Sequence, residues 1–215
     1  WNEVVDLCDK GIQYTPEELT YYYFMALAYI QQDKDQKAYE ACKRGLNEID
    51  LNKADEPERN MASDMYGIIG DMSYTANNYD EAFSAYEKAI TIYPDNIQVL
   101  NNYAYFLSLE ERDLEKALAM ASRATALTDN NPTYLDTHAW VLFKLGRVDE
   151  ARKIMQQAVA LDAQESAALL VHYGDILKAL GENFMAEIYW RKALEKGYDA
   201  GRIERRITES KAKKE

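Results

Sequence analysis

The sequence predicts an all-α protein built from repeated pairs of helices. Three observations support this prediction. Apolar residues recur at i, i+4 and i+7, which is the spacing of one helix face. A short phrase returns along the chain at intervals of 44, 35, 34 and 35 residues. Only four prolines and nine glycines interrupt the 215 residues, and few chain breakers favour long helices over many short strands.

The recurring phrase marks the second helix of each pair. It opens on a small residue, at Ala38, Ala82, Ala117, Ala151 and Ala186. Four residues later come Cys42, Tyr86, Ala121, Met155 and Trp190, and three beyond those come Gly45, Ala89, Ala124, Ala158 and Ala193. This spacing gives each second helix one continuous face for packing.

A second helical pattern lies upstream of each phrase and marks the first helix of each pair. The four positions Leu100, Tyr103, Ala104 and Leu107 illustrate its i, i+3, i+4, i+7 spacing. One equivalent place is always small, and there we expect two helix backbones to come close; its occupants are Gly70, Ala104, Ala139 and Gly174. Helix starts are predicted from Thr15 with Glu18, which have capping-box spacing, and from Pro132, since proline is tolerated in a first turn.

A helix–turn–helix unit of about 34 residues with these small residues resembles the tetratricopeptide repeat (TPR). The closest phrases run from Tyr79 to Pro94, from Asn101 to Tyr105 and from Asp136 to Arg147. The resemblance covers residues 1–200, and the phrases are similar to those of bacterial TPR proteins. It implies a right-handed superhelical solenoid. We expect a half repeat at 1–18 and a repeat with an insertion at 19–62. Four further repeats are expected at 63–96, 97–131, 132–166 and 167–200, followed by a capping helix with a basic tail at 201–215.

The insertion, 47–58, is polar and turn-forming, and explains the 44-residue interval. It is interpreted as a lengthened helix plus loop, with a functional protrusion as the alternative.

The charge of the chain restricts its partners. With 37 acidic and 25 basic residues the net charge is −12, which argues against nucleic acid, because a duplex is bound by clustered Lys and Arg. The tail from Arg202 to Glu215 is basic and reads as a solvated last helix, or as a contact for an anionic surface. The longest apolar run, Tyr21 to Ile30, is too short to span a membrane directly. The compartment stays open between periplasmic, outer-membrane-associated and cytoplasmic.

No cofactor, metal site or catalytic residue is predicted. Cys8 and Cys42 occupy equivalent places on successive repeats, whose helices pack too far apart for a disulfide, so we expect reduced core thiols. His138 and His172 lack metal-ligand spacing and are expected to pack and form hydrogen bonds. The Gly67–Gly70 segment lies inside a helix and lacks the Lys of a phosphate-binding loop; Gly67 is placed on the free face of that helix.

The resemblance implies that a second face of each first helix lines a concave groove that receives a partner. The predicted groove residues are Tyr23, Leu27, Asp64, Asp71, Tyr74, Asn101, Tyr105, Asp136, Trp140, Phe143 and Asp175. The alternative is that they pack against the neighbouring repeat. Trp140 and Phe143 are the predicted anchors, with Trp140 only partly buried.

The chemistry of these residues predicts the ligand. Members of the family that clamp a terminal carboxylate use Lys, Asn and Arg, whereas the matching places here hold Tyr23, Leu27, Ile68, Thr133 and Thr137. Aspartates beside aromatic rings suit an extended or helical protein segment with basic and apolar side chains. The predicted function is a non-catalytic protein-binding scaffold. The alternative is an architectural or substrate-selecting module of a larger protein, envelope-associated or enzymatic.

Overall fold

The chain folds into helical hairpins. The computed structural model describes residues 1–161 and 166–212, and over these residues it contains twelve α-helices and no strand. The helices are α1 (Asn2–Tyr14), α2 (Leu19–Ile30), α3 (Asp35–Glu48), α4 (Glu56–Thr75), α5 (Tyr79–Ile92), α6 (Ile97–Leu109), α7 (Leu114–Ala126), α8 (Pro132–Lys144), α9 (Val148–Ala160), α10 (Ala167–Ala179), α11 (Asn183–Glu195) and α12 (Ala200–Ala212). None of them, within the described ranges, is long and apolar enough to cross a bilayer.

Two parts of the sequence predictions lie outside the described residues. These are residues 162–165 of the expected repeat over 132–166 and the end of the basic tail, 213–215.

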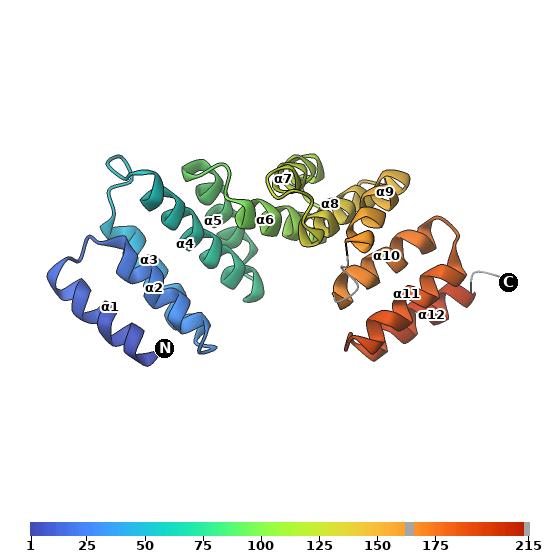
Figure 1. Ribbon diagram of the computed structural model, residues 1–215, viewed down its shortest axis with the longest axis horizontal. Coiled ribbons are helices and arrows are strands. Elements are labelled where there is room, and N and C mark those ends of the chain that lie inside the picture. The colour runs from blue at the N-terminus through green and yellow to red at the C-terminus, as the bar shows by residue number, and fades with distance from the viewer. Residues whose placement is uncertain (162–165, 213–215) are drawn as a thin grey trace. The chain divides into compact units, whose positions relative to one another are not determined.

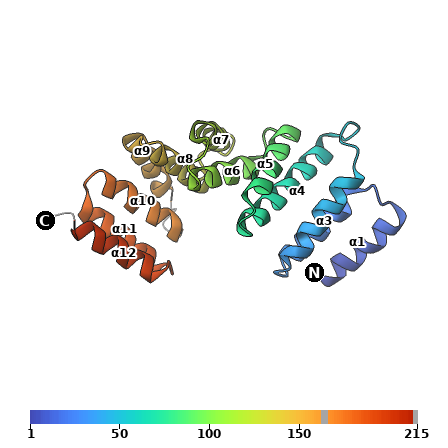
Figure 2. The ribbon, with the colours of Figure 1, turned by 180° about the vertical axis from the view of Figure 1, so that it is seen from behind.

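The helices are grouped in two compact units, Trp1–Tyr103 and Ala104–Glu215. In the first unit α2 packs on α3 and α4 on α5, while α1 covers α2. In the second, α8 packs on α9 and α10 on α11, and α12 lies against α11. Figures 1 and 2 show these hairpins from opposite sides. The predicted all-α fold of helix–turn–helix hairpins is confirmed.

Each unit has its own apolar core. The largest fully buried side chains of the first unit include Tyr22, Met65 and Tyr86. Those of the second include Met155 and Trp190. Tyr86, Met155 and Trp190 all come from the second position of the recurring phrase, so the phrase marks the face that packs.

The small residues of the first helices accommodate aromatic rings. A Cβ at Gly70 would lie 2.6 Å from the Tyr86 ring, and one at Gly174 would lie 2.4 Å from the Trp190 ring. At these two positions the atoms nearest to the glycine therefore belong to an aromatic ring of the second helix. A large side chain on the second helix of the hairpin fills the space that the missing Cβ leaves.

Helix starts differ from the prediction at one place. Thr15 does not begin α2: its hydroxyl donates to the Gly11 carbonyl and closes α1, while Glu18 is the N-cap of α2 and accepts from the Thr20 amide. The Thr15–Glu18 capping box was thus wrong. Pro132 does lie in the first turn of α8.

A complete capping box occurs instead inside the 47–58 insertion. The Glu58 amide donates to Asp55 Oδ1 at 2.9 Å, and the Asp55 amide donates to Glu58 Oε2 at 2.8 Å. The insertion consists of the end of α3, a loop over 49–55 and the start of α4, which at 20 residues is longer than the other helices. Satisfying the first amides of α4 in this way fixes where the lengthened helix begins.

Candidate functional site

Four predicted groove residues line one pocket of the first unit. Tyr23 and Leu27 extend from α2, and Asp64 and Asp71 extend from α4. The pocket has a volume of about 280 Å³. Its other lining residues are Ile30, Gly67, Ile68, Tyr86, Gln98, Val99 and Asn102. We call it the Asp64–Asp71 pocket.

Asp64 is held in place by one donor from α2 and one from the loop that precedes α6. The Tyr23 hydroxyl donates to Oδ2 of Asp64 at 3.0 Å, and the side-chain Nδ2 of Asn96 donates to Oδ1 of Asp64 at 2.7 Å. Asn96 also accepts from the Val99 amide at 3.1 Å and so caps α6. Sequence reasoning missed Asn96, although an Asn directly before a helical pattern is a capping signal.

Asp71 lies about two turns further along α4, on the same helix face as Asp64. Its carboxylate accepts from the Tyr86 hydroxyl and from Asn102 Nδ2, which is 3.2 Å from both oxygens. Burial raises the pKa of Asp71, although both hydrogen bonds oppose that shift. The energetic cost of burying this carboxylate would fall if a cation entered the pocket.

The pocket is acidic and has an apolar floor. None of its lining residues is a Lys or Arg, and no ion pair among the described residues involves Asp64 or Asp71. The pKa of Tyr23 is raised to about 12, mainly by burial and secondly by the negative charge of Asp64. The Tyr23 hydroxyl therefore remains a hydrogen-bond donor at neutral pH. The pocket can therefore receive a cationic or apolar side chain, whereas an anion would be repelled.

Gly67 does not lie on a free face. It is buried, and a Cβ there would lie 2.8 Å from a Val99 methyl group. The sequence interpretation of Gly67 was wrong because it did not consider the approach of α6 to α4. The missing side chain lets Val99 form part of the pocket floor.

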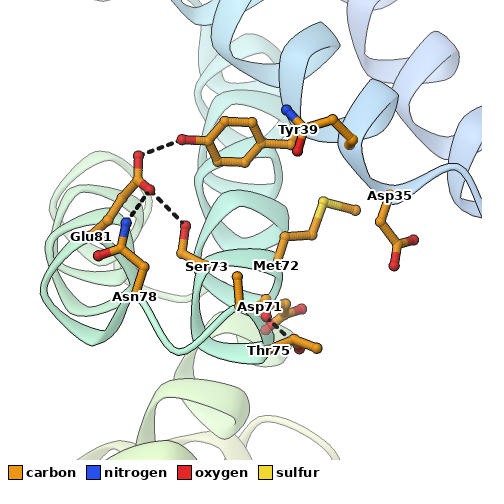
Figure 3. A pocket seen from close by; sticks show the side chains of 10 residues that line it. Asp35, Tyr39, Asp71, Met72, Ser73, Thr75, Asn78 and Glu81 are labelled. Atoms are coloured by element: carbon orange, nitrogen blue, oxygen red, sulfur yellow. Dashed lines mark hydrogen bonds between the residues drawn. The ribbon is translucent and has the colours of Figure 1, made fainter.

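A larger cavity of about 510 Å³ lies between α3, α4 and α5, and sequence reasoning missed it. Figure 3 shows its centre, where Glu81 accepts hydrogen bonds from Tyr39 at 2.5 Å, Ser73 at 3.1 Å and Asn78 at 2.9 Å. These donors, with that of Tyr39 first, lower the pKa of Glu81. This network joins two hairpins. Because both carboxylate oxygens of Glu81 already accept hydrogen bonds, it leaves little capacity for a ligand.

In the second unit, four predicted residues gather around His172. Asp136 Oδ1 lies 2.9 Å from His172 Nδ1. The ring centroids of Trp140 and Tyr105 lie 4.1 and 6.1 Å from that of His172. Phe143 contacts Trp140, with centroids 5.1 Å apart. His172, expected only to pack, is thus the centre of the cluster.

Trp140 is buried, with 8% of its surface exposed. The expectation that it is only partly buried was wrong, because the imidazole of the next repeat covers its face. Its Nε1 is also buried and finds no acceptor among the described residues.

Asp175 is already engaged inside the unit. Arg206 of α12 binds it with two hydrogen bonds, at 2.8 and 2.9 Å, and the Trp190 indole donates to it at 3.0 Å. The carboxylate that we predicted for a ligand holds the last helix instead.

Two predicted residues lie apart from these clusters. Tyr74 contacts the rings of Tyr79 and Phe83. Asn101 is 9% exposed and donates to Asn102 at 3.2 Å. Neither lines the Asp64–Asp71 pocket.

The cysteines and histidines form no metal site within the described ranges. Cys8 and Cys42 are buried and free, and burial raises the pKa of Cys42 to about 12. The pKa of His138 is lowered mainly by burial and secondly by the positive charge of Arg147.

The hairpins and their small-residue contacts define an all-α helical-repeat protein. Models of the tetratricopeptide repeat match residues 63–96, 85–119 and 137–201. The chain belongs to the tetratricopeptide-repeat family, whose members typically serve as non-catalytic scaffolds for protein interactions.

Known proteins are similar over most of the chain. A TPR repeat-containing protein of Pseudomonas aeruginosa is 26% identical over 161 residues, 74% of this chain, which spans only 25% of that relative's length. YrrB, described as a TPR protein with an unusual peptide-binding site, is 20% identical, with a TM-score of 0.67 over 91% of this chain and 95% of its own. Pseudomonas aeruginosa pilF is 19% identical, with a TM-score of 0.66 over 86% and 79%. MamA of Desulfovibrio magneticus RS-1 is 15% identical, with a TM-score of 0.63 over 83% and 94%.

Proposed function

We propose that this chain is a non-catalytic module that binds a protein segment carrying basic and apolar side chains, and that the Asp64–Asp71 pocket receives one basic side chain of that segment. The observation that carries the proposal is the pair of carboxylates without a cationic partner among the described residues, set above apolar walls. YrrB, a protein of the same fold, is described as having an unusual peptide-binding site, which supports a peptide segment as the ligand.

The pocket suits a Lys or Arg side chain for two reasons. Its volume of about 280 Å³ is sufficient for one long side chain. Leu27, Ile30 and Ile68 can contact the aliphatic stem, since Lys and Arg bury their methylene groups against apolar surface while the charged end reaches polar partners. The two carboxylates would then compensate the charge in a partly desolvated place.

The test is a binding measurement with labelled peptides in which Arg or Lys alternates with Leu, and with matched peptides in which Glu replaces the basic residues. The pocket variant carries Asp64→Asn and Asp71→Asn, which keep the side-chain shapes and remove the charge, while replacing one accepting oxygen of each carboxylate with an NH2 donor. The control variant carries Asp6→Asn and Asp33→Asn, which remove the same charge from exposed positions. Fluorescence anisotropy gives the affinity and thermal melting checks the fold.

We expect the basic peptides to bind the unmodified protein, and the pocket variant to bind them more weakly by about 1.5–3 kcal/mol, the range for hydrogen bonds to charged groups. The control variant should bind them nearly as well as the unmodified protein. Equal affinities for the pocket and control variants, or equal binding of the Glu peptides, would contradict the proposal.

A further inference from the structure

The second unit contains a hollow of opposite charge to the Asp64–Asp71 pocket. It has a volume of about 580 Å³ and is formed by α8, α10 and α12, the last of which is drawn in red in Figure 1. Its cationic lining residues are Lys178, Arg202, Arg205 and Arg206. We call it the α12 hollow.

One of these cations is not available to a ligand. Arg206 directs Nε and Nη2 to the two oxygens of Asp175, and its Nη1 lies 3.5 Å from the Arg202 carbonyl oxygen. Arg206 therefore holds α12 against α10, and its charge is balanced by Asp175.

A second cation is only weakly paired. Lys178 Nζ lies 3.9 Å from a carboxylate oxygen of Glu209, too far for a hydrogen bond. The Glu209 side chain is 60% exposed, and an exposed pair at this distance contributes little.

Arg202 and Arg205 leave two positive charges unbalanced. Both are exposed, and within the described residues neither guanidinium group forms an ion pair. This surplus is local, because the chain as a whole carries a net charge of −12. Four cations face two carboxylates in the hollow, so its field attracts an anion.

We propose that the α12 hollow binds an acidic segment of a protein partner, with its carboxylates on Arg202, Arg205 and Lys178 and an adjacent apolar side chain on Phe143. Guanidinium groups match carboxylates through two parallel hydrogen bonds. Phe143 is half-buried and lines the hollow, so it offers an apolar surface beside the charges. The volume is larger than a small inorganic anion requires, which favours a peptide segment.

This site does not depend on the proposed function of the Asp64–Asp71 pocket. The two sites are in different units and select opposite charges. A basic peptide that binds the first unit should be insensitive to changes at Arg202 and Arg205, so failure of one proposal is distinguishable from failure of the other.

The experiment measures anisotropy of a labelled peptide, acetyl-Glu-Asp-Leu-Phe-Glu-Asp, and of the same peptide with Gln and Asn in place of its acids. The hollow variant is Arg202→Gln with Arg205→Gln, which leaves Arg206 and its contact with Asp175 intact. The control variant is Lys10→Gln with Lys153→Gln, which removes the same charge from exposed positions outside the hollow. Thermal melting confirms that both variants are folded.

We expect the acidic peptide to bind the unmodified protein and the control variant alike, to bind more weakly as salt is added, and to lose about tenfold in affinity for the hollow variant, as removing two partly exposed charge contacts predicts. Equal loss in both variants, or equal binding of the uncharged peptide, would overturn the proposal. So would displacement of the peptide by millimolar phosphate, or binding of phosphatidylglycerol vesicles with the same variant dependence and no binding of the peptide. Self-association that disappears in the hollow variant would identify a second copy as the occupant and would also overturn it.

Discussion

The indole of Trp140 stacks on the imidazole of His172, with ring centroids 4.1 Å apart and planes 22° apart. The two residues belong to the first helices of successive hairpins, α8 and α10. His172 is fixed in turn by Asp136, whose carboxylate oxygen lies 2.9 Å from Nδ1. This arrangement makes Trp140 part of the packing between repeats, so its removal should first affect stability.

Trp140→Ala should destabilise the protein by about 3–5 kcal/mol, because it leaves a cavity beside His172 and Phe143. Trp140→Phe keeps a ring against the imidazole and should cost less. The free energy of unfolding from urea denaturation measures both. An unchanged free energy of unfolding in Trp140→Ala would mean that the indole is not part of the packing, and would return it to the role of an exposed anchor.

Gly174→Ala should destabilise by about 1–3 kcal/mol. The added methyl group would lie 2.4 Å from the indole of Trp190, which is fully buried and cannot move aside. Gly201→Ala is the matched control, since its methyl group would meet only an Asp199 oxygen at 3.5 Å. That variant should be neutral or slightly stabilised, because Ala favours a helix. Thermal melting compares the two, and equal melting temperatures would disprove the tight contact.

The hairpin fold could be predicted because its determinants are local and repeated. Residues such as Tyr86 and Trp190 fall at a fixed offset from the small residue that opens each phrase, so five copies reinforce one another. The contact of Gly174 with Trp190 was harder to predict from the sequence. Periodicity shows that a small residue is required, but not whether a backbone or a ring fills the space.

The candidate sites depend on contacts between repeats, which a single helix pattern does not contain. Asp175 and Arg206 are 31 residues apart, and nothing in the sequence of α10 indicates that a basic residue of α12 will pair with it. In the same way, the face of α8 that carries Trp140 looks free until His172 is placed over it. The pattern predicted which residues share a face, and the neighbouring repeat decided which of them stay accessible.

Arg206 and Asp175 should show a measurable coupling energy. Arg206→Gln and Asp175→Asn should each cost about 1.5–3 kcal/mol, because both partners are largely removed from solvent and joined by two charged hydrogen bonds. A double-mutant cycle should give a coupling of about 0.5–3 kcal/mol. Arg191→Gln is the control, since its pair with Glu187 is within one helix and Arg191 is 57% exposed; it should change stability by less than about 0.5 kcal/mol. Strict additivity of the two single changes would show that this contact does not hold α12.

Because of Asp71, the stability of the protein and its affinity for a basic peptide should depend on pH in opposite directions. Burial raises its pKa in the folded protein above the value in the unfolded chain. The folded state therefore holds the proton more tightly, and the stability gained from that proton is present in acid and is lost as pH rises through the folded-state pKa. Asp71→Asn cannot titrate, so its stability relative to the unmodified protein should improve as pH rises through that range. Urea denaturation at a series of pH values measures the difference.

Binding of a basic peptide requires the ionised carboxylate. The affinity of the unmodified protein should therefore fall as pH is lowered through the raised pKa of Asp71, whereas the Asp71→Asn variant should bind more weakly and lack this component of the pH dependence. Asp50→Asn is the control, because Asp50 is an exposed loop residue whose pKa is lowered, mainly by its hydrogen bond from Lys53. Its binding profile should match that of the unmodified protein. If the profiles of Asp71→Asn and the unmodified protein run parallel, Asp71 is not the group that the basic side chain meets.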